Sequence, residues 1–273
     1  MPPTEGGRLD GPRLDGPVPF RARGFAPRDL PVAGAVTLVG LLVLWQLGAW
    51  SGVISTSFIS DPVAIGQAIW TLARSGELWA NLGASLQRLA IGWVVGTLTG
   101  LVFGLAVGLF TLARSPGMAV VAALFPIPKI ALVPLFIIWF GIGEGSKVIT
   151  LATGVFFPMV ISTVAGIDAV PRTLIRMGQA FNMPWHAIVR KIILPGALPS
   201  ILSGFRITTS TAIVLLVAAE MVGAEKGIGA FVLAAGNLYD IDNLLAGIVL
   251  LSLIGLAISW VLDRLERVLL AWR

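Results

Sequence analysis

The stretch FNMPWHAIVRKIILP, residues 181–195, interrupts a chain that otherwise consists of long apolar runs. From residue 184 onward its apolar side chains recur at the i, i+3, i+4, i+7 and i+8 spacing of one helix face, with basic side chains on the other faces. The apolar set is Trp185, Ile188, Val189, Ile192 and Ile193, and the polar set is His186, Arg190 and Lys191. The pattern predicts a short amphipathic helix, which either lies on the membrane surface or fits a groove on a partner protein.

Prolines mark the ends of this helix. Pro184 suits a first helical turn, where a missing N–H costs nothing, and Pro195 and Pro199 are expected to stop the helix before the next apolar run. The preceding segment PRTLIRMGQAF, which starts at residue 171, is also helical in character. Asn182 lies where that first helix must reverse, and asparagine tolerates the left-handed conformation of such a turn. Residues 169–196 are therefore expected to form a structured loop of helix, turn and helix.

The composition indicates an integral membrane protein. Of the 273 residues, 56% are hydrophobic and 12% charged, whereas a soluble domain has roughly 25% charged residues. The absence of cysteine excludes a disulfide framework and a thiolate site, and the single His186 cannot form a histidine-ligated metal site. No G-x-x-x-x-G-K-[ST] loop and no cluster of carboxylates is present, so we expect no metal, no cofactor and no catalysis in this chain.

Six apolar stretches are long enough to cross a bilayer, which takes about 20 residues of helix. They lie near residues 32–53, 85–110, 118–140, 147–168, 197–222 and 243–263. The stretch DPVAIGQAIWTLAR at 61–74 is too short and too polar to cross, so we expect it at the surface or packed on the outer side. The sequence thus predicts an all-α integral membrane protein with six transmembrane helices.

The basic residues predict the orientation. With the N-terminus in the cytoplasm, thirteen of the nineteen Lys and Arg residues fall on that side, as the positive-inside rule requires, and both termini and the loop 169–196 are cytoplasmic. This distribution along span ends and the tail also argues against nucleic acid as a partner. Residues 1–30 are rich in Gly, Pro and Arg and are expected to be disordered. The alternative is a contact with anionic lipid or a partner through Arg21, Arg23 and Arg28.

The second span carries a row of glycines along one face of the helix. Its glycines recur every four residues and let another helix approach closely, either within one subunit or in a dimer. They are Gly92, Gly96, Gly100, Gly104 and Gly108.

The third span is interrupted by Pro126 and Pro128, with Lys129 beside them. Prolines leave backbone carbonyls without partners, and an ammonium inside a membrane is costly. Lys129 either faces a polar pathway and attracts an anionic solute, or pairs with an exposed carbonyl or reaches the membrane surface.

The fifth span contains Arg206 and Glu220, followed by Met221. The two charged residues lie about 21 Å apart along one helix, so each needs a partner elsewhere. Ion pairing is the expected role of Arg206. Glu220 and Met221, together with Pro126, Pro128 and Lys129, are candidates to line a translocation pathway.

The loop resembles the cytoplasmic EAA loop of permease subunits of binding-protein-dependent ABC importers, whose motif is E-A-A, three residues, G, nine residues and I-x-L-P. The sequence IILP at 192–195 matches its end, Asn182 stands at the glycine, and Arg176-Met177-Gly178 stand at E-A-A. The front of the motif is therefore degenerate. On this resemblance the coupling residues are Asn182, Pro184, Trp185, His186, Ile188, Val189, Arg190, Ile192, Leu194 and Pro195. We expect the face of Trp185 and Ile188, rather than a charge at Arg176, to carry the coupling to an ATPase.

The resemblance covers most of the chain from about residue 60. The stretches FPIPKIALVPLFIIWFGIGEGSKV, ATGVFFPMVISTVAGI and VAAEMVGAEKGIGAFVLAAGNLYDID are similar to the aliphatic-sulfonate, taurine and nitrate branch of this family. It implies a type I importer permease fold over residues 31–273 in the bacterial inner membrane. The implied partners are a second copy of the chain, two ABC ATPases that bind ATP and Mg²⁺, and an extracytoplasmic solute-binding protein.

Two alternative functions remain. An importer of the same class could carry bicarbonate or a heterocyclic vitamin precursor, because selectivity in such systems lies largely with the binding protein. An ion-coupled secondary transporter would show carboxylates at mid-membrane, whereas the acids of this chain gather near the span ends.

Overall fold

The computed structural model describes residues 31–55 and 59–271. The predicted tail 1–30, with Arg21, Arg23 and Arg28, lies outside the described residues. The chain divides into two compact units, residues 1–54 and 55–273, each described here by itself. The first unit contains α1 (Pro31–Trp50), an apolar helix of 20 residues that is long enough to cross a membrane.

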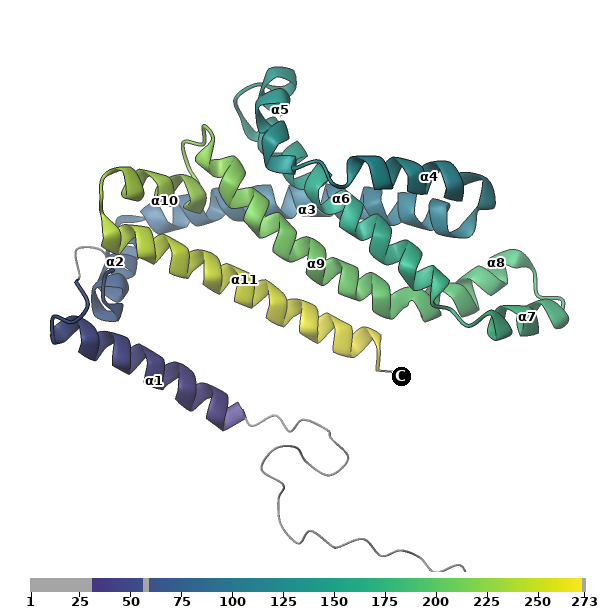
Figure 1. The fold of residues 1–273 in the computed structure, drawn as a ribbon, viewed down its shortest axis with the longest axis horizontal. Coiled ribbons are helices and arrows are strands. Elements are labelled where there is room, and N and C mark those ends of the chain that lie inside the picture. Colours follow the sequence, from purple (N-terminus) through teal and green to yellow (C-terminus); the bar gives the residue numbers. More distant parts are fainter. Residues whose placement is uncertain (1–30, 56–58, 272–273) are drawn as a thin grey trace, which may run out of the picture. The chain divides into compact units, whose positions relative to one another are not determined.

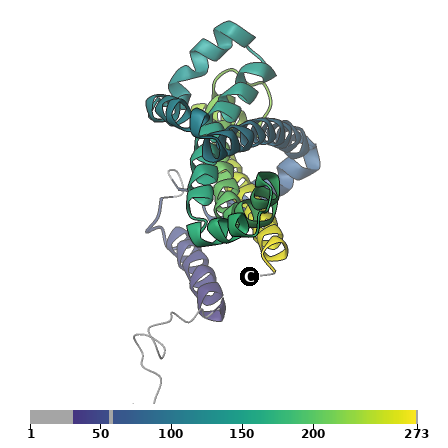
Figure 2. The same cartoon turned by 90° about the vertical axis from the view of Figure 1, so that its right-hand side faces the viewer.

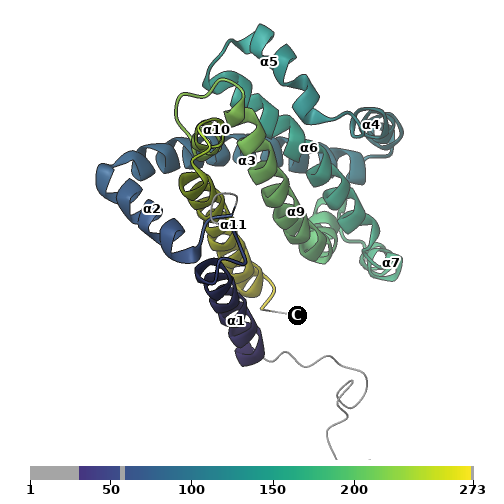
Figure 3. The same cartoon turned by 60° about the vertical axis from the view of Figure 1, so that its left-hand side comes forward.

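The described part of the second unit is helical (Figure 1). In chain order its elements are α2 (Pro62–Ser75), α3 (Glu77–Leu109), α4 (Thr111–Leu124), the 3₁₀ helix η2 (Lys129–Leu132), α5 (Val133–Phe140), α6 (Glu144–Asp168), α7 (Arg172–Ala180), α8 (Trp185–Ile188), the π-helical η3 (Val189–Ile193), α9 (Leu194–Met221), α10 (Ile228–Asn237) and α11 (Ile241–Leu269). Helices α10 and α2 lie at one end of this bundle and α7 and α8 at the other (Figures 1 and 3). Figure 2 views the unit from the end that carries α7 and α8.

The core of this unit is the layer formed by α3, α6 and α9. Helix α6 lies between the other two, and its buried side chains pack on both. A central cluster joins the three helices through Leu89, Leu151, Val155, Ala212, Leu215, Leu216 and Ala219. Helix α11 lies along α9 and α10, and α2 packs against α11 and α3 (Figure 3).

The glycine stripe of α3 faces α6. A Cβ atom added at Gly100 would lie 2.6 Å from the carbonyl oxygen of Phe156, and one at Gly104 would lie 2.7 Å from Cβ of Thr163. The same conflict with α6 arises at every member of the stripe, Gly92, Gly96, Gly100, Gly104 and Gly108. The two helices therefore touch along the stripe, with no room for a side chain.

Among the described residues, five helices are long and apolar enough to cross a membrane, or six if the bent pair α4 and η2–α5 counts as one span. That pair bends by 85° at the proline-containing break, so the third apolar stretch is not one straight helix. Helix α3 also begins eight residues before its apolar stretch, at Glu77. The short apolar helix α10 was not expected from the sequence, because ten residues are too few to register as a span.

The prediction that Pro195 and Pro199 end the amphipathic helix is wrong. Helix runs without interruption from Trp185 to Met221, 37 residues, through the π-helical η3. In η3 the N–H of Leu194 donates to the carbonyl of Val189, five residues back. The π turn shifts the backbone hydrogen bonding to the carbonyl five residues back just before Pro195, and the helix continues past this proline instead of ending there.

Candidate functional site

The turn between α7 and α8 has the geometry of a complete helix C-cap. Asn182 adopts the left-handed conformation, with φ of 53°. Its N–H donates to the carbonyl of Gln179 at 2.9 Å, and the next N–H, of Met183, donates to the carbonyl of Gly178 at 3.0 Å. These two bonds form a Schellman motif, which explains why asparagine can stand where the EAA motif has glycine.

Gly178 lets the two helices of the loop pack closely. A Cβ atom there would approach Cδ1 of Ile192 at 3.0 Å and Cγ1 of Ile188 at 3.3 Å. The last turn of α7 therefore packs against the apolar face of α8 and η3. The two helical parts of the loop 169–196 are thus in contact with each other.

The apolar face of α8 is divided between the chain itself and its surroundings. Ile188 is only 7% exposed, so the chain itself covers it in this conformation, and its contact with an ATPase stays a prediction. It lines a cavity of about 210 Å³ together with Leu109 and Phe110 at the end of α3 and Ile175 of α7. Val189, Ile192, Leu194 and Pro195 are half-buried. The end of α3 thus covers part of the apolar face of α8 that the helical periodicity predicts.

The outward surface of the loop is formed by other residues. Trp185 is 67% exposed, and its ring meets the edge of Phe110 at a centroid distance of 6.5 Å. Asn182, Pro184, His186 and Arg190 are exposed beside it. Two neighbours that the sequence did not identify as coupling residues extend this surface, Phe181 and Met177, at 76% and 51% exposure. We call the exposed set Met177, Phe181, Asn182, Pro184, Trp185, His186 and Arg190 the α7–α8 surface.

An ion network centred on the buried Arg88 lies at the opposite end of the bundle. Arg88 of α3 is 4% exposed and holds Glu144 of α6 in a two-bonded fork, through Nε at 2.6 Å and Nη2 at 2.7 Å. Its Nη1 donates to Glu220 of α9 at 2.8 Å and to the carbonyl of Lys226 at 2.6 Å. One guanidinium therefore ties α3, α6, α9 and the loop before α10 together.

Glu220 also caps a helix to which it does not belong. It accepts from the N–H of Gly229 in the first turn of α10 at 2.8 Å, and from the hydroxyl of Ser85 at 2.8 Å. The neighbouring N–H groups of Gly227 and Ile228 donate to Asn81 and to Ser85. Side chains of α3 and α9 thus satisfy the free N–H groups at the start of α10, where a carboxylate also meets the positive end of the helix dipole.

The network supplies the ionic partner that Glu220 was expected to need, which is Arg88. It also gives Glu220 a structural role in place of the proposed role in a pathway. The side chain of Glu220 is 0% exposed, so it does not line an open pathway in this conformation. Its neighbour Met221 is 36% exposed. Arg88, Ser85 and Asn81 were missed because they lie far from Glu220 in sequence. The one available signal was the arginine inside an apolar run, which demands a nearby acid.

Lys129 is held at the break between α4 and η2. Its Nζ donates to the carbonyls of Leu124, Phe125 and Ile127 at 2.8, 3.3 and 2.9 Å, and lies 4.5 Å from the ring centre of Phe157. An ammonium has three N–H donors, and three carbonyls accept here. The pairing of Lys129 with exposed carbonyls is thus the alternative seen in this conformation. Pro126 and Pro128 are exposed beside it.

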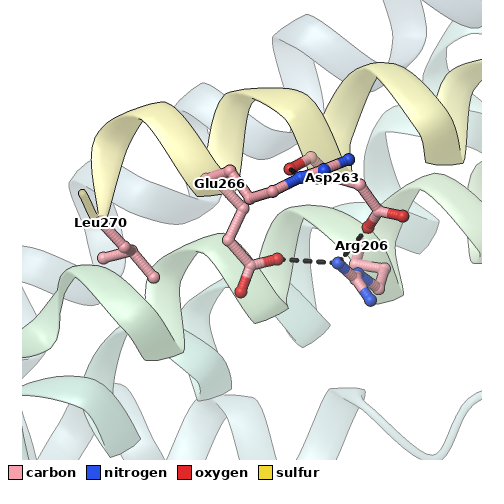
Figure 4. Close-up of a pocket in the computed structure, with 5 residues that line it drawn as sticks. Arg206, Asp263, Glu266 and Leu270 are labelled. Carbon is pink, nitrogen blue, oxygen red and sulfur yellow. Dashed lines mark hydrogen bonds and ion pairs between the residues drawn. The ribbon is translucent and has the colours of Figure 1, made fainter. Parts of the chain in front are cut away.

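Arg206 pairs with Asp263 and Glu266 of α11, so the expectation of an ion-paired Arg206 is confirmed. Figure 4 shows the guanidinium reaching from α9 toward both carboxylates. Within the described residues no group of three or more His, Cys, Asp or Glu side chains is placed to hold a metal ion.

Comparison with known proteins agrees with this architecture. The family described as binding-protein-dependent transport system inner membrane component matches residues 96–271. In solved structures, the inward-facing MetNI methionine ABC transporter aligns with a TM-score of 0.55 at 25% identity, over 73% of this chain and 96% of that one.

Curated relatives cover nearly the whole chain. SsuC of Escherichia coli (strain K12), named for aliphatic sulfonates transport, is 36% identical over 86% of this chain and 89% of its own length. SsuC of Bacillus subtilis (strain 168), of the same name, is 34% identical over 85% and 84%. The taurine transport system permease protein TauC of Escherichia coli (strain K12) is 34% identical over 86% and 88%. Because the family model matches residues 96–271 and these relatives are 34–36% identical over most of the chain, the chain belongs to the family of inner-membrane permease subunits of binding-protein-dependent ABC transporters.

Proposed function

We propose that this permease forms the pathway of an ATP-driven importer for a small sulfonate such as taurine or an alkanesulfonate. The observation that carries the proposal is the agreement of three relatives at 34–36% identity whose names specify sulfonates or taurine. Nitrate, bicarbonate and a heterocyclic vitamin precursor remain the alternative solutes. Two copies of the chain would surround one pathway, served by two ATPases that bind ATP and Mg²⁺ and by an extracytoplasmic solute-binding protein.

In this proposal both termini and the loop 169–196 lie in the cytoplasm, and the α7–α8 surface is the contact with the ATPase. Support comes from the exposure of Phe181 and Trp185. Large apolar side chains exposed together on one surface are typical of a contact with another protein. The acidic start of the EAA motif is replaced by Arg176, so shape and apolar contact would dominate this interface. Within it, Asn182 sets the turn that presents Trp185.

The continuous helix from Trp185 to Met221 suggests how coupling reaches the membrane. A helix of 37 residues is about 55 Å long. A displacement imposed at Trp185 by closure of the ATPase dimer would move α9 as a whole, because Trp185 and α9 belong to one continuous helix. The helix end near Trp185 also packs on α7 and on the end of α3 through Ile188 and Ile192. Movement of the α7–α8 surface would thus be transmitted along this helix to the pathway.

For the pathway itself we propose the break between α4 and η2. Pro126 and Pro128 are exposed there, and Met221 is the exposed neighbour of the sealed Glu220. Because the three donors of Lys129 are occupied, this residue would act on an anion through its charge at a distance rather than through a direct hydrogen bond.

The test is transport by the reconstituted assembly. The permease would be purified with its ATPase, inserted into vesicles loaded with ATP, and supplied with its binding protein and radiolabelled taurine. We expect uptake of radiolabelled taurine that is suppressed by unlabelled alkanesulfonates but not by nitrate. Uptake suppressed by nitrate or bicarbonate alone would assign a different solute, and uptake driven by an ion gradient without ATP would refute the ABC mechanism.

A further inference from the structure

A charged pocket lies between α9 and α11, outside every site described so far. It has a volume of about 450 Å³ and is lined by Arg206, Asp263, Glu266, Arg267 and Leu270 (Figure 4). We call it the α9–α11 pocket. Cavities of this size hold small ligands, and nothing in the coupling or transport proposal uses this one.

The sequence of α11 places the pocket at the level of lipid headgroups. Residues 244–262 contain no charged side chain, and as a helix they extend about 28 Å, close to the thickness of the hydrocarbon core. Charged residues begin directly afterwards, at Asp263. Trp260 lies at this boundary, with the guanidinium of Arg264 stacked 5.5 Å from its ring centre, an arrangement typical of a membrane interface.

The pocket holds both signs of charge in equal number. Arg206 and Arg267 supply two cations, and Asp263 and Glu266 supply two carboxylates. Both ion pairs of Arg206 are made by Nη2, so its Nε and Nη1 groups remain available as donors, and the side chain is 52% exposed. Among the described residues, Arg267 donates from Nε to the backbone carbonyl of Asp263 at 3.3 Å. The pocket can therefore receive a ligand with one anionic and one cationic group.

An apolar cavity of about 130 Å³ adjoins the charged pocket. The two share Arg206 and Glu266, and the rest of the cavity is lined by Trp93, Leu202, Phe205, Leu262, Leu265 and Leu269. A ligand that reached both would have a zwitterionic head and an apolar tail.

We propose that the α9–α11 pocket binds one phospholipid with a phosphoethanolamine headgroup. The phosphate contacts Arg206 and Arg267, the ammonium contacts Asp263 and Glu266, and the first few methylene groups of one acyl chain enter the apolar cavity. Because the pocket carries no net charge, it favours a zwitterionic headgroup over the anionic phosphatidylglycerol. A trimethylated amine has no N–H to donate, so phosphatidylcholine binds more weakly.

The experiment counts lipids on the purified permease–ATPase complex by native mass spectrometry. The complex is delipidated and exposed separately to phosphatidylethanolamine, phosphatidylcholine, phosphatidylglycerol and inorganic phosphate. We expect one tightly held phosphatidylethanolamine per permease copy and at least tenfold weaker retention of the other lipids. Equal retention of all lipids, preference for phosphatidylglycerol, binding of inorganic phosphate alone, or no retained lipid would each overturn the proposal.

Two variants assign the lipid to this pocket. Arg267→Gln removes a cation that has no ion pair in the described structure, and Leu265→Phe fills the apolar cavity while leaving the charges in place. Both are expected to reduce phosphatidylethanolamine retention at least fivefold. The matched control is Arg114→Gln, which removes an exposed arginine paired with Asp168 on other helices. Retention unchanged in Arg267→Gln and Leu265→Phe, or equally reduced in Arg114→Gln, would place the lipid elsewhere.

Discussion

Gly227 lies so close to the carboxylate of Glu220 that a Cβ atom on the glycine would fall 2.5 Å from its Cδ. Gly227 also has a φ of 139°, which side chains rarely permit. The loop before α10 therefore wraps around a buried charge at a point where only glycine fits. This contact closes the ion network at the end of the bundle away from the α7–α8 surface.

Replacement of Gly227 by alanine is expected to destabilise the folded protein. The strained φ alone costs about 1–3 kcal/mol, and the clash with Glu220 adds to it. Thermal unfolding of the purified complex would measure the loss. Gly83→Ala is the matched control, because a Cβ atom at Gly83 in α3 meets nothing within 4 Å. A loss of similar size in both variants would contradict the role of Gly227.

Arg88→Gln should be more damaging than Glu220→Gln. Removal of Arg88 leaves Glu220 as an unpaired buried carboxylate, which costs about 3–5 kcal/mol. Removal of the charge at Glu220 leaves Arg88 still paired with Glu144. The double variant should lose less stability than the two single variants together, since the partners are in contact. Unfolding midpoints of the three variants test this, and simple additivity would show that the pair is not coupled.

Trp185→Asp and Ile188→Asp are expected to fail for different reasons. Trp185 is exposed, so its variant should unfold at the wild-type temperature but lose solute-stimulated ATP hydrolysis at least tenfold. Ile188 is buried against α3 and α7, so its variant should lower the unfolding temperature as well. Unaltered ATP hydrolysis with Trp185→Asp would exclude the α7–α8 surface as the ATPase contact.

Gly100→Leu should separate α3 from α6. The nearest atom to a Cβ at this position is a backbone oxygen, of Phe156, which cannot rotate away as a side chain can. The packing of the core layer would have to shift along its whole length, and we expect little assembled complex after purification. Leu98→Ala, at a position of α3 that is 54% exposed, is the control. Recovery of Gly100→Leu at wild-type yield would show that the stripe does not require close contact.

Lys129→Gln should weaken the bent span, because the shorter amide side chain has no charge and only two N–H donors for three backbone carbonyls. We expect a lower unfolding temperature and slower uptake, with partial rescue in Lys129→Arg, which can still donate to several acceptors. If Lys129→Gln changed neither stability nor uptake, the carbonyl contacts would be dispensable. The salt dependence of uptake would separately show whether the charge acts on an anionic solute.

The features that could be predicted from the sequence are those encoded by neighbouring residues. Apolar length revealed the spans, and the capacity of Asn182 for a left-handed turn revealed the reversal after α7. Proline positions revealed the interruption of the third span, but not its 85° bend, which the local sequence does not specify.

The features that escaped prediction depend on contacts between distant segments. Helical periodicity shows that Ile188 lies on an apolar face, but not that the end of α3 covers it. The burial of Glu220 depends on Arg88, 132 positions earlier in the chain. Pro195 signals a helix end by local rules, and only the π turn before it lets the helix continue.

That π turn also takes up one extra residue between the coupling end of the helix and its membrane-spanning part. A π turn contains one residue more than an α-helical turn, and each residue of an α-helix rotates the chain by about 100°. Deletion of a single residue within Val189–Ile193 would therefore restore regular α-helical pitch and leave Trp185 facing nearly the same way. Deletion of a residue in the regular α-helical part of α9 would instead rotate Trp185 by about 100° relative to the membrane-spanning part of the helix. The π turn is thus the place in this helix where a change of length by one residue can occur without turning the coupling surface.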